Sequence, residues 1–88
     1  MITSLYILES QKDNSYYVGI TNNLRRRIEE HNLGKVFSTK HKIPFKLIFS
    51  QDFPDKAAAM AKEKQLKSWK KRKAIERYIN KALSSSSV

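Results

Sequence analysis

Three short stretches of the chain, residues 3–9, 16–20 and 45–50, are dominated by apolar and aromatic residues interrupted by single polar positions. Short runs of this kind bounded by turn residues are typical of β-strands. The residues between the first two stretches, Lys12-Asp13-Asn14-Ser15, favour turns, so these two stretches are predicted to form an antiparallel hairpin.

Three longer stretches have helical spacing of their apolar positions. The first covers residues 23–32, where Asn22 is the predicted cap and Gly34 lies just past the end. The second is capped by Asp55 and runs through an alanine-rich segment to about residue 69. The third covers residues 71–83, and its apolar face is Ala74, Ile75, Tyr78, Ile79 and Ala82.

The resulting order, β-β-α-β-α-α, predicts a small α/β (α+β) domain. Three strands cannot bury their apolar residues alone, so we expect a three-stranded antiparallel sheet flanked by three helices. The 88 residues suffice for one modest core, and the predicted domain covers residues 1–83. The serine-rich residues 84–88 are predicted to form a disordered tail.

Charge narrows the range of partners. The chain has 18 Lys and Arg against 8 Asp and Glu, a net charge of +10, which attracts polyanions. We expect the polyanion to be nucleic acid, and consider it more in keeping with this charge than an anionic membrane or a helix face that is only solvated. The absence of cysteine excludes disulfides and thiolate metal sites. With no apolar run of about 20 residues and no secretory leader pattern, a cytoplasmic protein is predicted.

Polar residues interrupt the apolar face of the first predicted helix. Arg27 and His31 follow Leu24 at +3 and +7 and share its stripe with Ile28. A guanidinium at such a position needs an anion or a cleft, because its burial without a partner is costly. A structural carboxylate, or a stem that carries the charge to water, would satisfy Arg27 equally well.

The second predicted helix breaks its pattern in the same way. Glu63 lies angularly between Ala59, Met60 and Leu66, and a carboxylate there needs an arginine, a lysine or a metal ion. An ion pair between Glu63 and Arg27 would also explain both residues. Charged residues on two core-facing stripes indicate a shared site.

A glycine inside the second predicted strand gives a third signal. Gly19 weakens a strand unless backbone or a ligand comes close, so we expect a tight approach beside Tyr17. Tyr6 and Tyr17 taken singly are more typical of packing, because tyrosine is a good strand residue.

These residues together resemble the GIY-YIG nuclease superfamily, and specifically its small stand-alone bacterial members related to the catalytic module of the excision-repair nuclease. Ser4-Leu5-Tyr6 and Tyr17-Val18-Gly19 stand in the places of the two signatures. The spacing of Arg27 and His31 and the segment 63–69 are similar as well, and the resemblance runs from Ser4 to Asn80. The first signature retains only its tyrosine.

The resemblance implies a DNA endonuclease in which Tyr6, Tyr17, Arg27, His31 and Glu63 form the site. It implies that one tyrosine is the general base while the other positions water or phosphate, and the neighbouring glycine favours Tyr17. A nearby cation must then lower the pKa of that tyrosine or take up its proton. Arg27 would clamp the scissile phosphate through its planar fork, and His31 would orient a tyrosine, contact phosphate or serve as a hydrogen-bonded support.

One divalent ion, Mg²⁺ or Mn²⁺, fits this chain better than two. Only 8 residues are acidic, no Asp-x-Asp occurs, and Glu63 is the one carboxylate expected on an apolar helix face. The resemblance implies the same single ion, bound by Glu63 with water and phosphate oxygens completing its shell.

DNA is the expected partner. With every helix committed to the sheet, selectivity is expected to come from DNA shape or from a repair or targeting protein. The alternative is a non-catalytic nucleic-acid-binding or repair-accessory module. The residues expected to contact DNA are Lys40, His41, Lys67, Lys70, Lys71, Arg72 and Lys73, and further candidates for the site are Gly19, Thr39 and Asn80.

Overall fold

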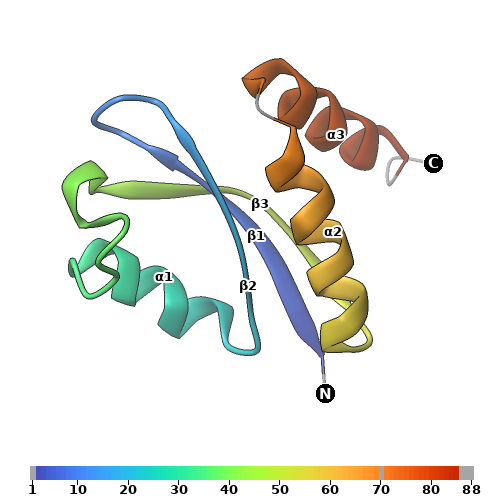
Figure 1. Cartoon of the computed structure of the whole chain (residues 1–88), viewed down its shortest axis with the longest axis horizontal. Coiled ribbons are helices and arrows are strands. Elements are labelled where there is room, and N and C mark those ends of the chain that lie inside the picture. Colours follow the sequence, from blue (N-terminus) through green and yellow to red (C-terminus); the bar gives the residue numbers. More distant parts are fainter. Residues whose placement is uncertain (1, 70, 86–88) are drawn as a thin grey trace.

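The computed structural model describes residues 2–69 and 71–85 and confirms the predicted α+β class and element order. The elements follow the chain from the blue N-terminus to the red C-terminal helix in Figure 1. They are β1 (Thr3–Ser10), β2 (Tyr16–Thr21), α1 (Leu24–Asn32), the 3₁₀ turn η1 (Lys40–Lys42), β3 (Phe45–Phe53), α2 (Lys56–Ser68) and α3 (Arg72–Ser85).

The sheet is antiparallel with strand order β2-β1-β3, so β1 is central and β2 and β3 form the edges. Tyr6 of β1 lies opposite Gly19 on one side and Ser50 on the other. The pairing of β1 with β3 shifts register between Ile7 and Leu8. This central strand therefore contributes to both faces of the sheet and contacts both edges.

Two layers of helix enclose the sheet. In Figure 1, α1 lies on one side of the strands and α2 and α3 lie on the other. Successive side chains of a strand point to opposite faces. Accordingly, Leu5 and Ile7 belong to an apolar core with residues of α2 and α3, whereas Tyr6 and Leu8 pack toward Leu24 and Ile28 of α1.

Side chains near the ends of α1 fix this helix against the sheet. Asn23 caps its first turn by accepting a hydrogen bond from the backbone of Arg26, one residue later than the predicted cap Asn22. At the other end, the Asn32 side chain accepts from the Phe45 N–H at 2.6 Å and donates to the Phe45 carbonyl at 3.2 Å. The start of β3 therefore holds the C-terminal end of α1.

The second half of the chain differs from expectation in its details. Asp55 caps α2 as predicted, but Met60 is 48% exposed rather than on the buried face, which is marked by Ala59 and Leu66. β3 runs three residues further than predicted, to Phe53.

The C-terminal helix α3 also runs past its predicted end. It continues to Ser85, so the predicted disordered tail loses its first two residues to the helix, and residues 86–88 lie outside the described residues. Among the helices described, none is long and apolar enough to span a membrane.

Candidate active site

A buried chain of hydrogen bonds lies between β1 and α1. The Tyr6 hydroxyl is 3.0 Å from His31 Nε2, and His31 Nδ1 is 2.8 Å from the Thr39 hydroxyl. Tyr6 is 1%, His31 0% and Thr39 3% exposed. Polar side chains buried this completely require hydrogen-bond partners. Here the three side chains are partners of one another, with His31 in the middle.

The surrounding bonds favour one direction for the chain of hydrogen bonds. Thr39 donates its hydroxyl proton to the Val36 carbonyl at 3.4 Å, so its oxygen accepts from Nδ1–H of His31. Nε2 of the neutral ring is then an acceptor, and the Tyr6 hydroxyl donates to it. Burial and the nearby charge of Arg27 both lower the pKa of His31 below its ordinary value of 6.5, which keeps the ring neutral and able to accept a hydrogen bond at Nε2.

Arg27 joins the chain at its outer end. Its Nε donates to the Tyr6 hydroxyl at 3.4 Å, and its Nη1 contacts the Glu30 carboxylate at 3.4 Å. Burial raises the pKa of Tyr6 above 10.0, and Arg27 opposes that shift through its hydrogen bond without reversing it. Arg27 thus lowers the pKa of Tyr6, as expected of a neighbouring cation, but burial outweighs it.

Gly19 makes room for the Tyr6 phenol. A Cβ built at Gly19 would collide with the hydroxyl oxygen and with Cζ of Tyr6. The close approach expected at Gly19 is therefore present, but it is made by Tyr6, its partner across the strands, and not by a ligand. The glycine thus gives no reason to prefer Tyr17 over Tyr6 as the base.

Tyr17 lies at the outer side of the same cluster. Its ring centroid is 4.9 Å from that of His31 and 6.3 Å from that of Tyr6, and the residue is half-buried, in contrast to Tyr6. The amino group of Lys67 lies 5.6 Å from the centroid of the Tyr17 ring. Tyr17 therefore forms the boundary between the buried chain and the surface beside α2.

Glu63 approaches the cluster from α2. Its carboxylate is 3.3 Å from Lys67 Nζ, and its charge contributes to raising the pKa of Tyr6. The suggested ion pair between Glu63 and Arg27 does not occur, because each residue has another partner, Lys67 and Glu30 respectively. The site therefore draws on both helix layers and reaches across the edge strand β2, which contacts α2.

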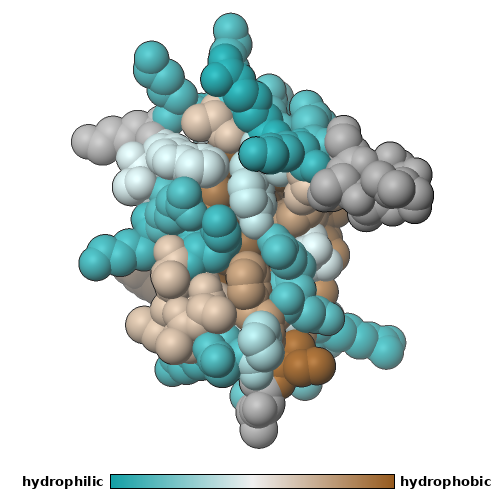
Figure 2. Space-filling model, turned by 90° about the vertical axis from the view of Figure 1, so that its right-hand side faces the viewer, coloured by the Kyte–Doolittle hydropathy of each residue, from teal (hydrophilic) through white to brown (hydrophobic). Residues whose placement is uncertain are grey.

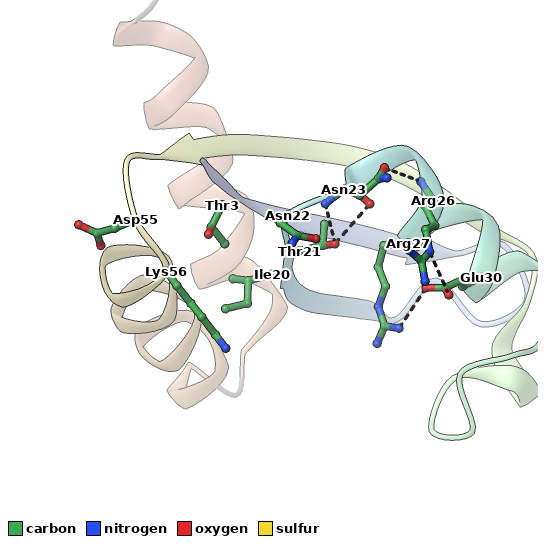
Figure 3. Close-up of a pocket in the computed structure, with 10 residues that line it drawn as sticks. All are labelled: Thr3, Ile20, Thr21, Asn22, Asn23, Arg26, Arg27, Glu30, Asp55 and Lys56. Atoms are coloured by element: carbon green, nitrogen blue, oxygen red, sulfur yellow. Dashed lines mark hydrogen bonds and ion pairs between the residues drawn. The ribbon is translucent and has the colours of Figure 1, made fainter. Parts of the chain in front are cut away.

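A cavity of about 590 Å³ opens beside Arg27, between the N-terminal ends of α1 and α2. In Figure 3 the side chains of Arg27, from α1, and Lys56, from α2, both point toward the bottom of the view. Glu30 was not among the predicted site residues, but it lines the cavity and pairs with both Arg26, at 3.7 Å, and Arg27. Its spacing of three from Arg27 is the signal that could have revealed it.

The remaining candidates divide by position. Thr39 lies behind His31 in the interior, where its hydroxyl supports the imidazole ring. Arg72 is held by Glu9, Glu76 and the Asn14 carbonyl, so its guanidinium is engaged within the fold. Asn80 is exposed on α3, and no contact among the described residues joins it to the cluster.

The basic candidates are more accessible. Lys40 and His41 are exposed in η1, and Lys71 and Lys73 are exposed around the start of α3. Lys70 lies outside the described residues.

Comparison with known proteins places the chain in a family. The family model of the GIY-YIG catalytic domain matches residues 3–80. The chain belongs to the GIY-YIG family. The matched range includes both tyrosines, Arg27, His31 and Glu63.

Curated relatives of this chain carry the name UPF0213. A UPF0213 protein of Streptococcus pneumoniae is 43% identical over 77 residues, covering 86% of this chain and 76% of the relative. The UPF0213 protein YazA of Bacillus subtilis is 44% identical over 69 residues, covering 77% and 69%. The solution structure of the UPF0213 protein BH0048 from Bacillus halodurans has a TM-score of 0.60 and 36% identity, covering 91% of this chain and 84% of that one.

Proposed function

We propose that this GIY-YIG protein is a DNA endonuclease that hydrolyses phosphodiester bonds with one divalent metal ion and little sequence preference. The observation that carries the proposal is the convergence of Tyr6, Tyr17, Arg27 and His31 beside Glu63. Hydrolysis of a phosphodiester needs an oriented water molecule and positive charge on the phosphate. The cluster offers groups suited to both tasks.

Arg27 is the proposed phosphate clamp. Its side chain is 36% exposed, and its Nε bond to Tyr6 holds the guanidinium plane while one edge faces the cavity with Glu30. A planar fork of this kind makes two parallel bonds to phosphate oxygens, which an ammonium group cannot imitate. The buried chain behind Arg27 thus serves as its support.

Tyr17 is the proposed contact with the attacking water. It is the more exposed of the two tyrosines, and Lys67 places a positive charge next to its ring. Tyr6 is too deeply buried to touch the substrate. It acts as a positioning residue, because its hydroxyl is hydrogen-bonded to both His31 and Arg27 and holds the guanidinium in place. His31 in turn is the neutral acceptor at the end of this path.

The donor set fits a single hard cation. Within residues 2–69 and 71–85, no three His, Asp or Glu side chains gather closely enough to hold a metal ion by themselves. Mg²⁺ is commonly bound by one or two carboxylates together with water and substrate phosphate oxygens, and Glu63 supplies such a carboxylate at 22% exposure. The bound ion would supply charge neutralisation at the phosphate.

The test is cleavage of supercoiled plasmid and of a branched oligonucleotide, with Mg²⁺, with Mn²⁺ and with chelator. We expect the parent to cut only with metal and Glu63→Gln to lose cutting. Glu29→Gln is the matched control, because Glu29 is an exposed carboxylate paired with Arg25 on α1. Cutting by Glu63→Gln at the parent rate would contradict the metal assignment.

The alternative function is distinguishable in the same experiment. A non-catalytic nucleic-acid-binding module would bind both substrates and leave them intact under every metal condition. Binding without cutting by a folded parent protein would therefore replace the endonuclease proposal with the accessory module.

A further inference from the structure

A second cavity lies on the opposite side of the sheet from the buried chain. Its volume is about 600 Å³, and it opens between β3, α2 and α3. The residues that line it include Gln51 of β3, Lys62 and Trp69 at α2, and Tyr78 of α3. Tyr17 and this cavity thus belong to opposite edge strands, β2 and β3, with β1 between them.

Aromatic rings form part of its wall. Trp69 and Tyr78 meet edge to face with centroids 6.2 Å apart, and the Tyr78 hydroxyl donates to the side-chain oxygen of Gln51. Lys62 Nζ lies 5.2 Å from the centroid of the Tyr78 ring. These contacts hold both rings in place at the surface, and both are only partly buried.

The charge of the cavity is of one sign. Lys62, Arg77 and Lys81 line it, and no Asp or Glu is among its described lining residues. Across the described part of the chain, no carboxylate forms an ion pair with Arg77 or Lys81. Figure 2, which looks onto α2 and α3, shows hydrophilic side chains gathered over much of this face with paler side chains between them.

The cations come from two helices that border the groove. Arg77 and Lys81 are one turn apart on α3, so their Cβ atoms are about 5–6 Å apart along the helix. Lys62 adds a third charge from α2. Cations distributed along a groove beside aromatic rings are the combination that binds single-stranded nucleic acid, because phosphates follow the charge while bases stack.

We propose that this groove between α2 and α3 binds an unpaired strand of nucleic acid, with bases against Trp69 and Tyr78 and phosphates along Arg77 and Lys81. The groove is separate from the proposed active site and needs neither metal nor Glu63. Its occupant would give the protein a second hold on a substrate that carries an unpaired segment beyond the bond to be cut.

The test measures binding of a labelled oligothymidylate by fluorescence anisotropy in chelator, over a range of salt concentrations. The double variant Arg77→Gln/Lys81→Gln is compared with the double variant Arg25→Gln/Lys64→Gln. The second variant also removes one arginine and one lysine charge, but from exposed helix positions outside the groove. We expect the groove variant to bind about tenfold more weakly than the control. We also expect its salt dependence, the slope of log K against log salt, to fall by about 1.4, or about 0.7 for each lost phosphate contact.

Trp69 supplies an independent readout, because it is the chain's single tryptophan. We expect oligothymidylate to quench its fluorescence in the parent and in Glu63→Gln, and to quench it at higher concentrations in the groove variant. Since binding is measured in chelator and without cleavage, failure of the endonuclease proposal would leave this result intact.

Several outcomes would overturn the groove assignment. One is equal affinity and equal salt slope in the two double variants, with circular dichroism showing both folded. Another is displacement of the strand by thymidine monophosphate at the same nucleotide concentration, which would make the cavity a mononucleotide site. Equal binding of a duplex or of polyglutamate would show that an unpaired strand is not what the groove selects.

Discussion

The two faces of β1 differ in what they pack against. Toward α2 and α3, Leu5 and Ile7 are fully buried among apolar residues such as Leu66 and Ile75. Toward α1, Tyr6 is equally buried but reaches the polar side chain of His31. The first face stabilises the fold by burying apolar area. The second face buries polar groups, which stabilise the fold only when all of them are hydrogen-bonded.

This difference shows where the candidate site lies relative to the core of this small domain. With 88 residues, the protein has one sheet and little interior, so the site cannot be separated from the core. Substitutions on the α2 and α3 face should change stability first. Substitutions on the α1 face should change activity out of proportion to stability.

The largest effect is expected on the α1 face at Tyr17. Tyr17→Phe keeps the ring against His31 and removes only the hydroxyl, so we expect plasmid cleavage to fall about 10²–10⁴-fold while stability changes by less than about 1 kcal/mol. Tyr16→Phe is the control, since Tyr16 neighbours it on β2 but packs with the other core.

The same experiment decides between the two tyrosines. Tyr6→Phe leaves Nε2 of His31 without its donor, so it should lose about 1–3 kcal/mol of stability together with activity. Full activity in Tyr17→Phe with loss in Tyr6→Phe would assign the general base to Tyr6.

The opposite face should show the reverse pattern. Ile7→Ala opens a cavity in the fully buried apolar core, and we expect a loss of about 2–5 kcal/mol in the free energy of unfolding, measured with urea. Cleavage by the fraction that remains folded should be unchanged. Leu47→Ala, at a position 37% exposed on β3, should lose much less. A specific loss of cleavage in folded Ile7→Ala would show that the two faces are not separable.

Gly19 lies on β2 and tests the boundary between stability and activity. Gly19→Ala forces a Cβ against the Tyr6 phenol, so we expect a loss of about 1–3 kcal/mol together with reduced cleavage as Tyr6 and Arg27 shift. Gly34→Ala is the comparison, since its cost comes from its positive φ of 77° and not from contact with the site. Equal retention of activity in the two variants would show that the Tyr6 position does not matter.

The spacing of apolar residues predicted the fold because each helix and strand shows this spacing within its own short segment. Asp55 precedes a helix-forming alanine run, and the α3 face that includes Ile75 and Ile79 repeats at helical spacing, so these elements needed no tertiary information. The prediction for Met60 was wrong because it lies one position from Ala59, and the helix turns it to the surface.

The composition of the site was predictable, but the partnerships within it were not. Arg27 and His31 stood out as polar residues on an apolar stripe. The sequence could not show that Tyr6 fills the space left by Gly19, because that contact depends on the strand register. Nor could it show that Thr39, on a loop without a periodic pattern, returns to hold His31.

The smallest effect is expected in the pH dependence of stability, and it again separates the two faces. His31 is buried neutral with a pKa below 6.5, whereas in the unfolded chain its pKa is about 6.5. The unfolded state therefore binds more protons as the pH falls below 6.5, and stability is lost through that window and fully present above it. The loss is at most about 1.4 kcal/mol per pH unit.

Urea unfolding at pH 7.5 and at pH 5.5 measures this effect. We expect the parent to lose more stability on acidification than His31→Gln, which has no titrating ring. His41→Gln should behave like the parent, because His41 is exposed in η1 and carries no buried partner there. If His31→Gln and the parent lost the same stability, the pKa of His31 would be the same in the folded and unfolded states, and burial would not be lowering it.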